Sequence, residues 1–150
     1  MSNAWVQSPV AQVRTQVERT MSEENQSANG VLVVEDNPVN AMVNRLMLER
    51  LGVPVTIAEN GKVALEKLRE ARFRLVLMDI SMPEMDGVEA TRIIRSGAEP
   101  GIDSAVPIIA ITAHTLQGDA EEFLGAGMNA CLSKPVSLEA MEETIRNFML

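Results

Sequence analysis

Short apolar runs alternate with helical patterns from Val31 to the end of the chain. We expect strands at the apolar runs, and helices where apolar side chains recur every three or four residues. The expected strands are Val31–Val34, Val53–Ile57, Leu75–Met78, Val106–Ile111 and Ala130–Leu132. The expected helices span 38–51, 60–71, 84–96, 115–126 and 137–149.

The order of these elements predicts an α/β fold. The first, third and fourth apolar runs are apolar throughout, which is typical of parallel strands that are covered on both faces. Pro38 and Ser137 stand where helix starts are expected, and Gly52 stands where a helix stop is expected. Alternating strands and helices therefore predict an open, doubly wound parallel sheet of five strands.

Residues 1–29 differ in pattern from the rest of the chain. The stretch 21–30 is polar, small and rich in turn-forming residues, which indicates a linker. Valines at helical spacing favour a short helix before this linker. An expression-vector remnant is an alternative interpretation of the opening residues. We expect a linker or disordered segment over 1–29 and one globular domain over 30–150. The valines are Val6, Val10, Val13 and Val17.

Composition narrows the class of protein further. The chain is 46% hydrophobic and 23% charged, as ordinary globular domains are. Its formal net charge of −8 argues against direct contact with a nucleic-acid backbone. Cys131 is the only cysteine, so no intrachain disulfide can form, and no apolar run is long enough to cross a bilayer. These features favour a cytoplasmic protein.

Polar residues follow the predicted strands at their carboxyl ends. Glu35 and Asp36 follow the first strand, Asp79 the third, Thr112 the fourth and Lys134 the fifth. In an open parallel sheet, ligands bind beyond the carboxyl ends of the strands, at the point where the strand order reverses. We therefore expect these five side chains to meet at one edge of the sheet.

Each acidic residue alone is better explained as a turn or helix cap. That explanation does not account for three acids gathered with a lysine, because two unit charges about 4 Å apart repel by about 4 kcal/mol at an effective dielectric of 20. A divalent cation would relieve the repulsion, and Mg²⁺ prefers carboxylate, water and phosphate oxygens. A lysine and a hydroxyl suit a phosphoryl group, whose transfer depends on positioning and charge neutralisation.

Four segments closely resemble the receiver domains of two-component response regulators. They are VLVVEDNPVN (31–40), LVLMDISMPEMDG (75–87), PIIAITAH (107–114) and LSKP (132–135), and they stand in the right order at suitable spacing. The resemblance covers the chain from about Val31 to Leu150. It implies a phosphoacceptor domain with a CheY-like fold, in which the five strands follow the flavodoxin-like order 2-1-3-4-5.

The resemblance assigns the acidic residues to the phosphorylation chemistry. Asp79 corresponds to the phosphoacceptor and covalent nucleophile. Glu35 and Asp36 occupy the paired acidic positions that hold Mg²⁺ directly or through water. Asp79 and the backbone carbonyl of Ser81 are the further metal ligands that the resemblance implies.

The same resemblance assigns the switch positions. Thr112 corresponds to the hydroxyl that moves toward the phosphoryl oxygen, and Lys134 to the ammonium that pairs with the phosphoryl group. The Lys134–Pro135 bond is expected to be cis. Cys131 stands where receivers usually carry an aromatic switch residue, so the usual aromatic signal of phosphorylation is absent from this sequence.

The expected partner is a histidine kinase or a histidine phosphotransfer domain. NPVN, ITAHT and GMNACLSKP resemble receivers fused to hybrid sensor histidine kinases, and the polar linker fits a tether to an upstream kinase core. The alternative is a free-standing single-domain regulator, because the chain begins with Met and ends at Leu150 without an output domain. By itself the domain would promote only its own phosphorylation and dephosphorylation.

Two other classes of function fit less well. A phosphatase with an aspartate nucleophile usually carries a second acid two residues later, and this chain has Ser81 there. A dinucleotide-binding domain needs a glycine-rich loop after its first strand, where this chain has Asn37 and Pro38.

The first predicted helix has more apolar residues than one core face needs. They spread over about two-thirds of its circumference, whereas packing on a sheet needs a stripe of about 100°. To the core we assign Val43, Met47 and Leu51, with Leu48 at the edge of the stripe. The remaining residues lie beside the acidic pocket and predict a docking patch: Val39, Met42 and Leu46. Burial of all three by the sheet's twist or by the linker is the alternative.

Overall fold

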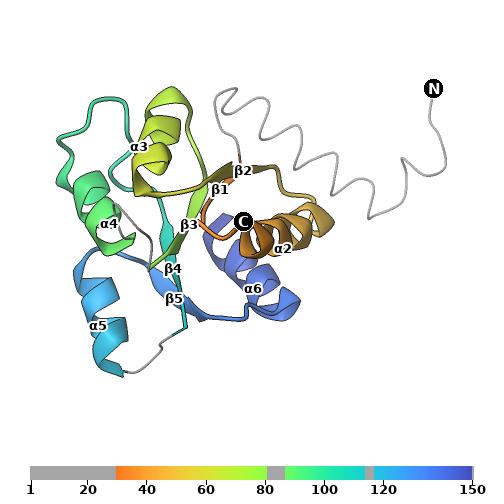
Figure 1. Cartoon of the computed structure of the whole chain (residues 1–150). Coiled ribbons are helices and arrows are strands. Elements are labelled where there is room, and N and C mark those ends of the chain that lie inside the picture. Colours follow the sequence, from red (N-terminus) through yellow and green to blue (C-terminus); the bar gives the residue numbers. More distant parts are fainter. Residues whose placement is uncertain (1–29, 81–86, 114–116, 150) are drawn as a thin grey trace, which may run out of the picture.

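A single parallel sheet forms the centre of the molecule (Figure 1). The computed structural model describes residues 30–80, 87–113 and 117–149. Its strands lie in the order β2-β1-β3-β4-β5, and all four neighbouring pairs are parallel, so the predicted fold and strand order are confirmed. The strands are β1 (Val31–Val34), β2 (Val55–Ala58), β3 (Leu75–Asp79), β4 (Ile108–Thr112) and β5 (Ala130–Ser133).

Helices cover both faces of the sheet, as the predicted doubly wound fold requires. Figure 1 shows α2 and α6 on one face and α3, α4 and α5 on the other. The helices are α2 (Pro38–Arg50), α3 (Gly61–Glu70), α4 (Gly87–Ser96), α5 (Gln117–Gly125) and α6 (Leu138–Met149). The linker and short helix predicted within 1–29 lie outside the described residues. Among those that are described, no helix has both the length and the apolar character to span a membrane.

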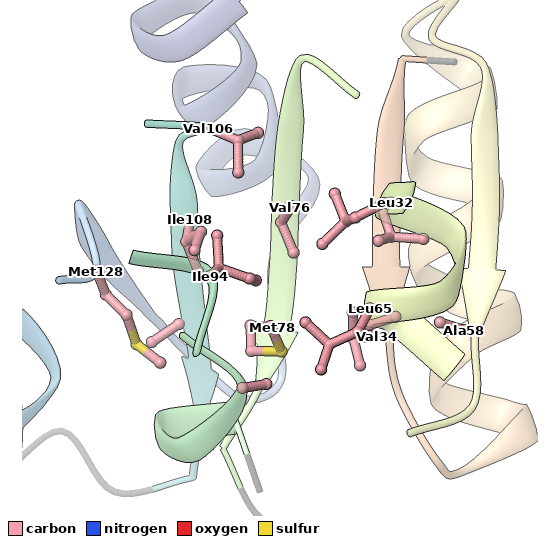
Figure 2. Packing of buried hydrophobic residues seen from close by; sticks show 14 of the residues in the cluster. Leu32, Val34, Ala58, Leu65, Val76, Met78, Ile94, Val106, Ile108 and Met128 are labelled. Atoms are coloured by element: carbon pink, nitrogen blue, oxygen red, sulfur yellow. The ribbon is translucent and has the colours of Figure 1, made fainter. Parts of the chain in front are cut away.

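Two hydrophobic cores lie between the sheet and these two helix layers. Successive strand residues point to opposite faces. On β1, Leu32 and Val34 therefore face α3 and α4, while Val31 and Val33 belong to the core of the opposite face. Figure 2 shows the first core, in which Met78 of β3 lies among the side chains of neighbouring elements. The apolar strands are thus buried on both faces, as their sequences predict.

The predicted helix boundaries have a clear local cause. Pro38 stands at the start of α2, where its missing N–H is not needed for the helix. Gly52 follows that helix with a φ of +79°, a conformation that glycine adopts without steric cost. Before α6, the hydroxyl of Ser137 accepts a hydrogen bond from the backbone N–H of Ala140 at 3.1 Å, which caps the helix.

The predicted core stripe of α2 is wrong in part. The helix buries Ala41, Asn44 and Leu48, which lie in one row facing the sheet and α6. Val43 is 44% exposed, because at 100° per residue it lies on the opposite side of the helix from that row. The predicted core face was wrong because the sequence pattern counts only large apolar side chains, whereas this helix also packs through an alanine and an asparagine.

Candidate functional site at the carboxyl edge of the sheet

The three predicted acidic residues meet where β1 and β3 end. Val34 and Met78 are register partners, so Glu35 and Asp79 follow them at neighbouring positions on the sheet edge. Carboxylate oxygens of Glu35, Asp36 and Asp79 all lie within 4.8 Å of one another. Glu35 and Asp79 are each only 3% exposed, whereas Asp36 is exposed to solvent. The predicted acidic cluster is therefore present, with one open side.

Lys134 reaches the same cluster from the end of β5. Its Nζ lies 3.1 Å from Oδ1 of Asp79 and 3.7 Å from Oε1 of Glu35. The backbone N–H of Lys134 donates to the carbonyl oxygen of Thr112 at 2.8 Å, which holds the lysine against β4. The Lys134–Pro135 peptide bond is cis, as predicted.

The predicted switch residues lie on β4 and β5. Thr112 is the last residue of β4 and is 4% exposed, and it follows Ile111, the register partner of Asp79. Cys131 lies in β5 opposite Ala110 and is half-buried against the core beneath α3 and α4. Ser81, the remaining predicted metal ligand, lies outside the described residues.

The crowding of carboxyl groups changes the protonation of Glu35. Burial, a hydrogen bond with Asp79 and the negative charge of Asp79 together raise the pKa of Glu35 from 4.5 to about 7. The backbone N–H of Asn37 and the charge of Lys134 oppose this rise. Near neutral pH the carboxyl group of Glu35 therefore still binds a proton in part of the molecules, and a divalent cation at the site would displace that proton.

The acidic neighbours of Lys134 keep its side chain protonated. Partial burial alone would lower the pKa of its ammonium group, but the hydrogen bond and charge of Asp79, together with Glu35, raise that pKa above its ordinary value. The lysine is therefore a permanent cation at the site. Three acids and one lysine leave a negative balance that a hard divalent cation can neutralise.

The donor set fits Mg²⁺. All three side chains offer carboxylate oxygens, the ligands that hard cations prefer, and they are close enough to share one ion. The exposed Asp36 leaves room for the water ligands that Mg²⁺ keeps. Half-buried Lys134 and buried Thr112 add a cation and a hydroxyl at the same edge, which suits binding of a phosphoryl group.

Comparison with known protein families agrees with this site. The family model of the response regulator receiver domain matches residues 31–146, which include every strand of the described fold and the whole acidic cluster. The chain belongs to the response regulator receiver family. The resemblance noted in the sequence is thereby confirmed.

Curated relatives of this receiver domain are histidine kinases. The chain is 37% identical to histidine kinase 5 of Arabidopsis thaliana over 142 residues, which cover 79% of this chain and 15% of that protein. It is 36% identical to the signal transduction histidine-protein kinase BarA of Escherichia coli over 130 residues, 87% of this chain and 13% of that kinase. The receiver domain thus spans a small part of the length of these relatives.

Solved structures of receivers have the same fold. The receiver domain of sensor histidine kinase PA1611 from Pseudomonas aeruginosa is 41% identical, with a TM-score of 0.71 over 81% of this chain and 97% of that one. That crystal structure holds a magnesium ion in its active-site cleft. The receiver domain of Ssk1 from Saccharomyces cerevisiae, solved with the histidine phosphotransfer protein Ypd1, is 31% identical with a TM-score of 0.72, over 81% of this chain and 89% of that chain.

The sequence did not identify Gly87 as part of this receiver's site. A Cβ atom at this position would collide with the backbone carbonyl of Asp79 and lie 2.8 Å from Cγ of Met78. The glycine therefore lets α4 begin directly against the end of β3, and its N–H donates to the carbonyl of Ile80 at 3.2 Å. Its place at the end of the 75–87 segment, near the start of a predicted helix, is the signal that could have indicated this role.

Proposed function

We propose that this domain accepts a phosphoryl group on Asp79 from a phosphohistidine of a partner protein, with Mg²⁺ bound by Glu35, Asp36 and Asp79. The observation that carries the proposal is the buried carboxylate of Asp79, held 3.1 Å from the Lys134 ammonium beside two further acids. A structural salt bridge would need one acid, whereas this site gathers three beside one lysine.

The described residues supply the parts that phosphoryl transfer needs. One carboxylate oxygen of Asp79 forms the new O–P bond while the N–P bond of the phosphohistidine breaks, and the histidine regains a proton. Lys134 neutralises charge on the phosphoryl group, and the Thr112 hydroxyl donates a hydrogen bond to one of its oxygens. When bound, Mg²⁺ supplies further charge neutralisation at the phosphoryl oxygens. The backbone carbonyl of Ser81, a residue outside the described part of the chain, is a further metal ligand that we propose.

Labelling with acetyl phosphate and Mg²⁺ tests this assignment. Mass spectrometry should place one phosphoryl group on Asp79 of the wild type, and Asp79→Asn should remain unlabelled. Asp103→Asn is the matched control, since Asp103 is exposed and pairs with Arg72 far from the cluster. Label on any residue other than Asp79 would refute the proposal.

We further propose that the partner docks on α2. The exposed apolar residues of this helix form what we call the α2 patch: Val39 (70% exposed), Met42 (52%), Val43 (44%) and Leu46 (59%). The helix begins at Pro38, two residues after Asp36, so the patch lies near the acidic cluster. Such a patch suits the helix bundle that presents a phosphorylated histidine. The solved complex of Ypd1 with the Ssk1 receiver supports a partner of this kind.

Met42→Asp and Leu46→Asp separate docking from folding. Both side chains are exposed, so we expect the variants to fold and to react with acetyl phosphate as the wild type does. Phosphotransfer from a histidine phosphotransfer domain should fall by about tenfold or more, because a charge would face an apolar interface. Leu124→Asp on α5 is the control, being 54% exposed on the opposite side of the sheet (Figure 1). Equal transfer rates in all variants would contradict docking at α2.

The larger context that we propose is a hybrid sensor histidine kinase. The support is that the relatives reported above are histidine kinases of which this domain matches 13–15%. We place the domain in the cytoplasm, consistent with a sequence whose only cysteine is Cys131. The gene sequence upstream of the codon for residue 1 tests this context. A kinase core encoded there in the same reading frame supports the hybrid kinase. Translation that starts at the codon for residue 1 favours a free-standing regulator.

A further inference from the structure

Asn37 joins the acidic cluster to helix α2 through its side chain and its backbone. Its Oδ1 accepts hydrogen bonds from the backbone N–H groups of Val39 at 2.9 Å and Asn40 at 3.2 Å, so it caps the helix. Its own backbone N–H donates to Oε2 of Glu35 at 3.3 Å. One residue therefore fixes the helix start and contacts a member of the cluster.

The cap determines where the backbone N–H of Asn37 points. The side-chain hydrogen bonds hold Asn37 in an extended conformation, with φ −86° and ψ 118°, while its carbonyl accepts from Ala41 at 2.9 Å. In this conformation the N–H turns back toward the carboxylate of Glu35. Because Oε1 of Glu35 lies 3.7 Å from Nζ of Lys134, the carboxylate is held on both of its oxygens.

The same turn also sets the position of Asp36. This residue lies between Glu35 and Asn37 in the chain and is the exposed member of the cluster. A turn that was free to move would let both acids rotate away from Asp79. The oxygen of the Asn37 side chain is already engaged by two helix N–H groups, so it acts on the acids through the backbone and not as a ligand.

We infer that Asn37 is a positioning residue that preorganises Glu35 and Asp36 for the divalent cation. The inference rests on the proposed function, because it concerns the same metal site. A role as helix cap alone predicts a loss of stability with unchanged metal affinity. A positioning role predicts weaker metal binding, because groups that orient metal ligands commonly contribute a factor of about ten or more to affinity.

Mg²⁺ titrations of the whole chain, followed by ¹H–¹⁵N NMR shifts, distinguish the two roles. Asn37→Ala should weaken Mg²⁺ binding by about tenfold. Asn37→Ser, which keeps a capping oxygen, should bind within about twofold of the wild type. The matched control is Asn60→Ala, because Asn60 caps α3 by accepting from the N–H of Val63 at 2.8 Å, on the far side of β1 from Asp79. This control should lose stability and keep its Mg²⁺ affinity.

Each contrary result has a separate meaning. If the wild type binds Mg²⁺ and Asn37→Ala binds it equally well, the positioning role is wrong and the proposed function stands. The positioning role is also wrong if Asn60→Ala weakens binding as much as Asn37→Ala does. If the wild type fails to bind Mg²⁺ at millimolar concentrations, the proposed metal site fails, and the role of Asn37 fails with it.

Discussion

The carboxyl group of Glu35 holds its proton more tightly than an ordinary glutamate does, and the reason is its position. It is buried beside Asp79, so ionising it places a second negative charge in a poorly solvated site. Its pKa of about 7 lies above the 4.5 of an unperturbed glutamate, so the folded protein binds this proton more strongly than the unfolded chain does. The contribution to stability is complete below pH 4.5 and is lost as the pH rises through 7.

The metal-free protein should therefore be more stable at about pH 5 than at about pH 8. Since each pKa unit corresponds to about 1.4 kcal/mol, we expect a loss on the order of 2 kcal/mol across this range from Glu35. Glu35→Gln, which resembles the protonated acid, should reduce the loss and stabilise the protein at the higher pH. Urea denaturation in EDTA at a series of pH values measures both effects. If the free energy of unfolding changed with pH equally in wild type and variant, the pH dependence would not come from Glu35.

The sequence predicted much of the site at this scale because strand ends converge in a parallel sheet. Glu35, Asp36, Asp79 and Lys134 each follow an apolar run, so their meeting depends only on the fold. Gly87 and Asn37 were not predicted as site residues. The role of Gly87 depends on how closely α4 approaches the end of β3, and the role inferred for Asn37 depends on the local conformation of the turn from Glu35 to Asn37. Residue patterns encode neither of these.

Helix α2 illustrates what sequence patterns determine about an element. The pattern predicted its extent and its surplus of apolar residues, and Val39, Met42 and Leu46 are indeed exposed. It misplaced Val43, because a helix whose apolar residues cover most of its circumference has no single apolar face to read. Close packing against the sheet determines which face of the helix is buried. The small side chain of Ala41 on that face allows the helix to approach the sheet closely.

Two truncations on this helix test the corrected packing. Leu48 is fully buried, so Leu48→Ala should lower the free energy of unfolding by about 2–5 kcal/mol through lost apolar burial and a cavity. Val43→Ala should change it by less than about 0.5 kcal/mol, because the Val43 side chain is substantially exposed. Chemical denaturation measures both values. If Val43→Ala lowered the free energy of unfolding more than Leu48→Ala does, Val43 would belong to the core, as the sequence pattern predicted.

The whole domain is defined by two cores that share one sheet. Among the residues that the structure describes, the two cores draw on the chain from Val31 to Met149, and both terminal elements of the described fold contribute. Val31 and Val33 come from β1, while Met141 and Ile145 of α6 close the face that this helix shares with α2. Because these elements already cover both faces of the sheet, we predict that folding requires only residues 30–150.

A truncated chain that begins at Gly30 tests this boundary. Its free energy of unfolding should match that of the whole chain within the roughly 10–15% uncertainty of denaturant extrapolation. Acetyl phosphate should label Asp79 at the same rate, because β1, β3 and β5, which position Glu35, Asp79 and Lys134, all lie within the retained chain.

A second truncation at the opposite end serves as the control. Removing α6 should unfold the domain, because it takes Met141 and Ile145 out of the core and uncovers the sheet face that carries Leu75 and Leu77. If the chain from Gly30 proved less stable than the full chain by several kcal/mol, residues 1–29 would be part of the domain, and the boundary at Gly30 would be wrong. If only its phosphotransfer from the partner fell, residues 1–29 would instead belong to the docking surface beside α2.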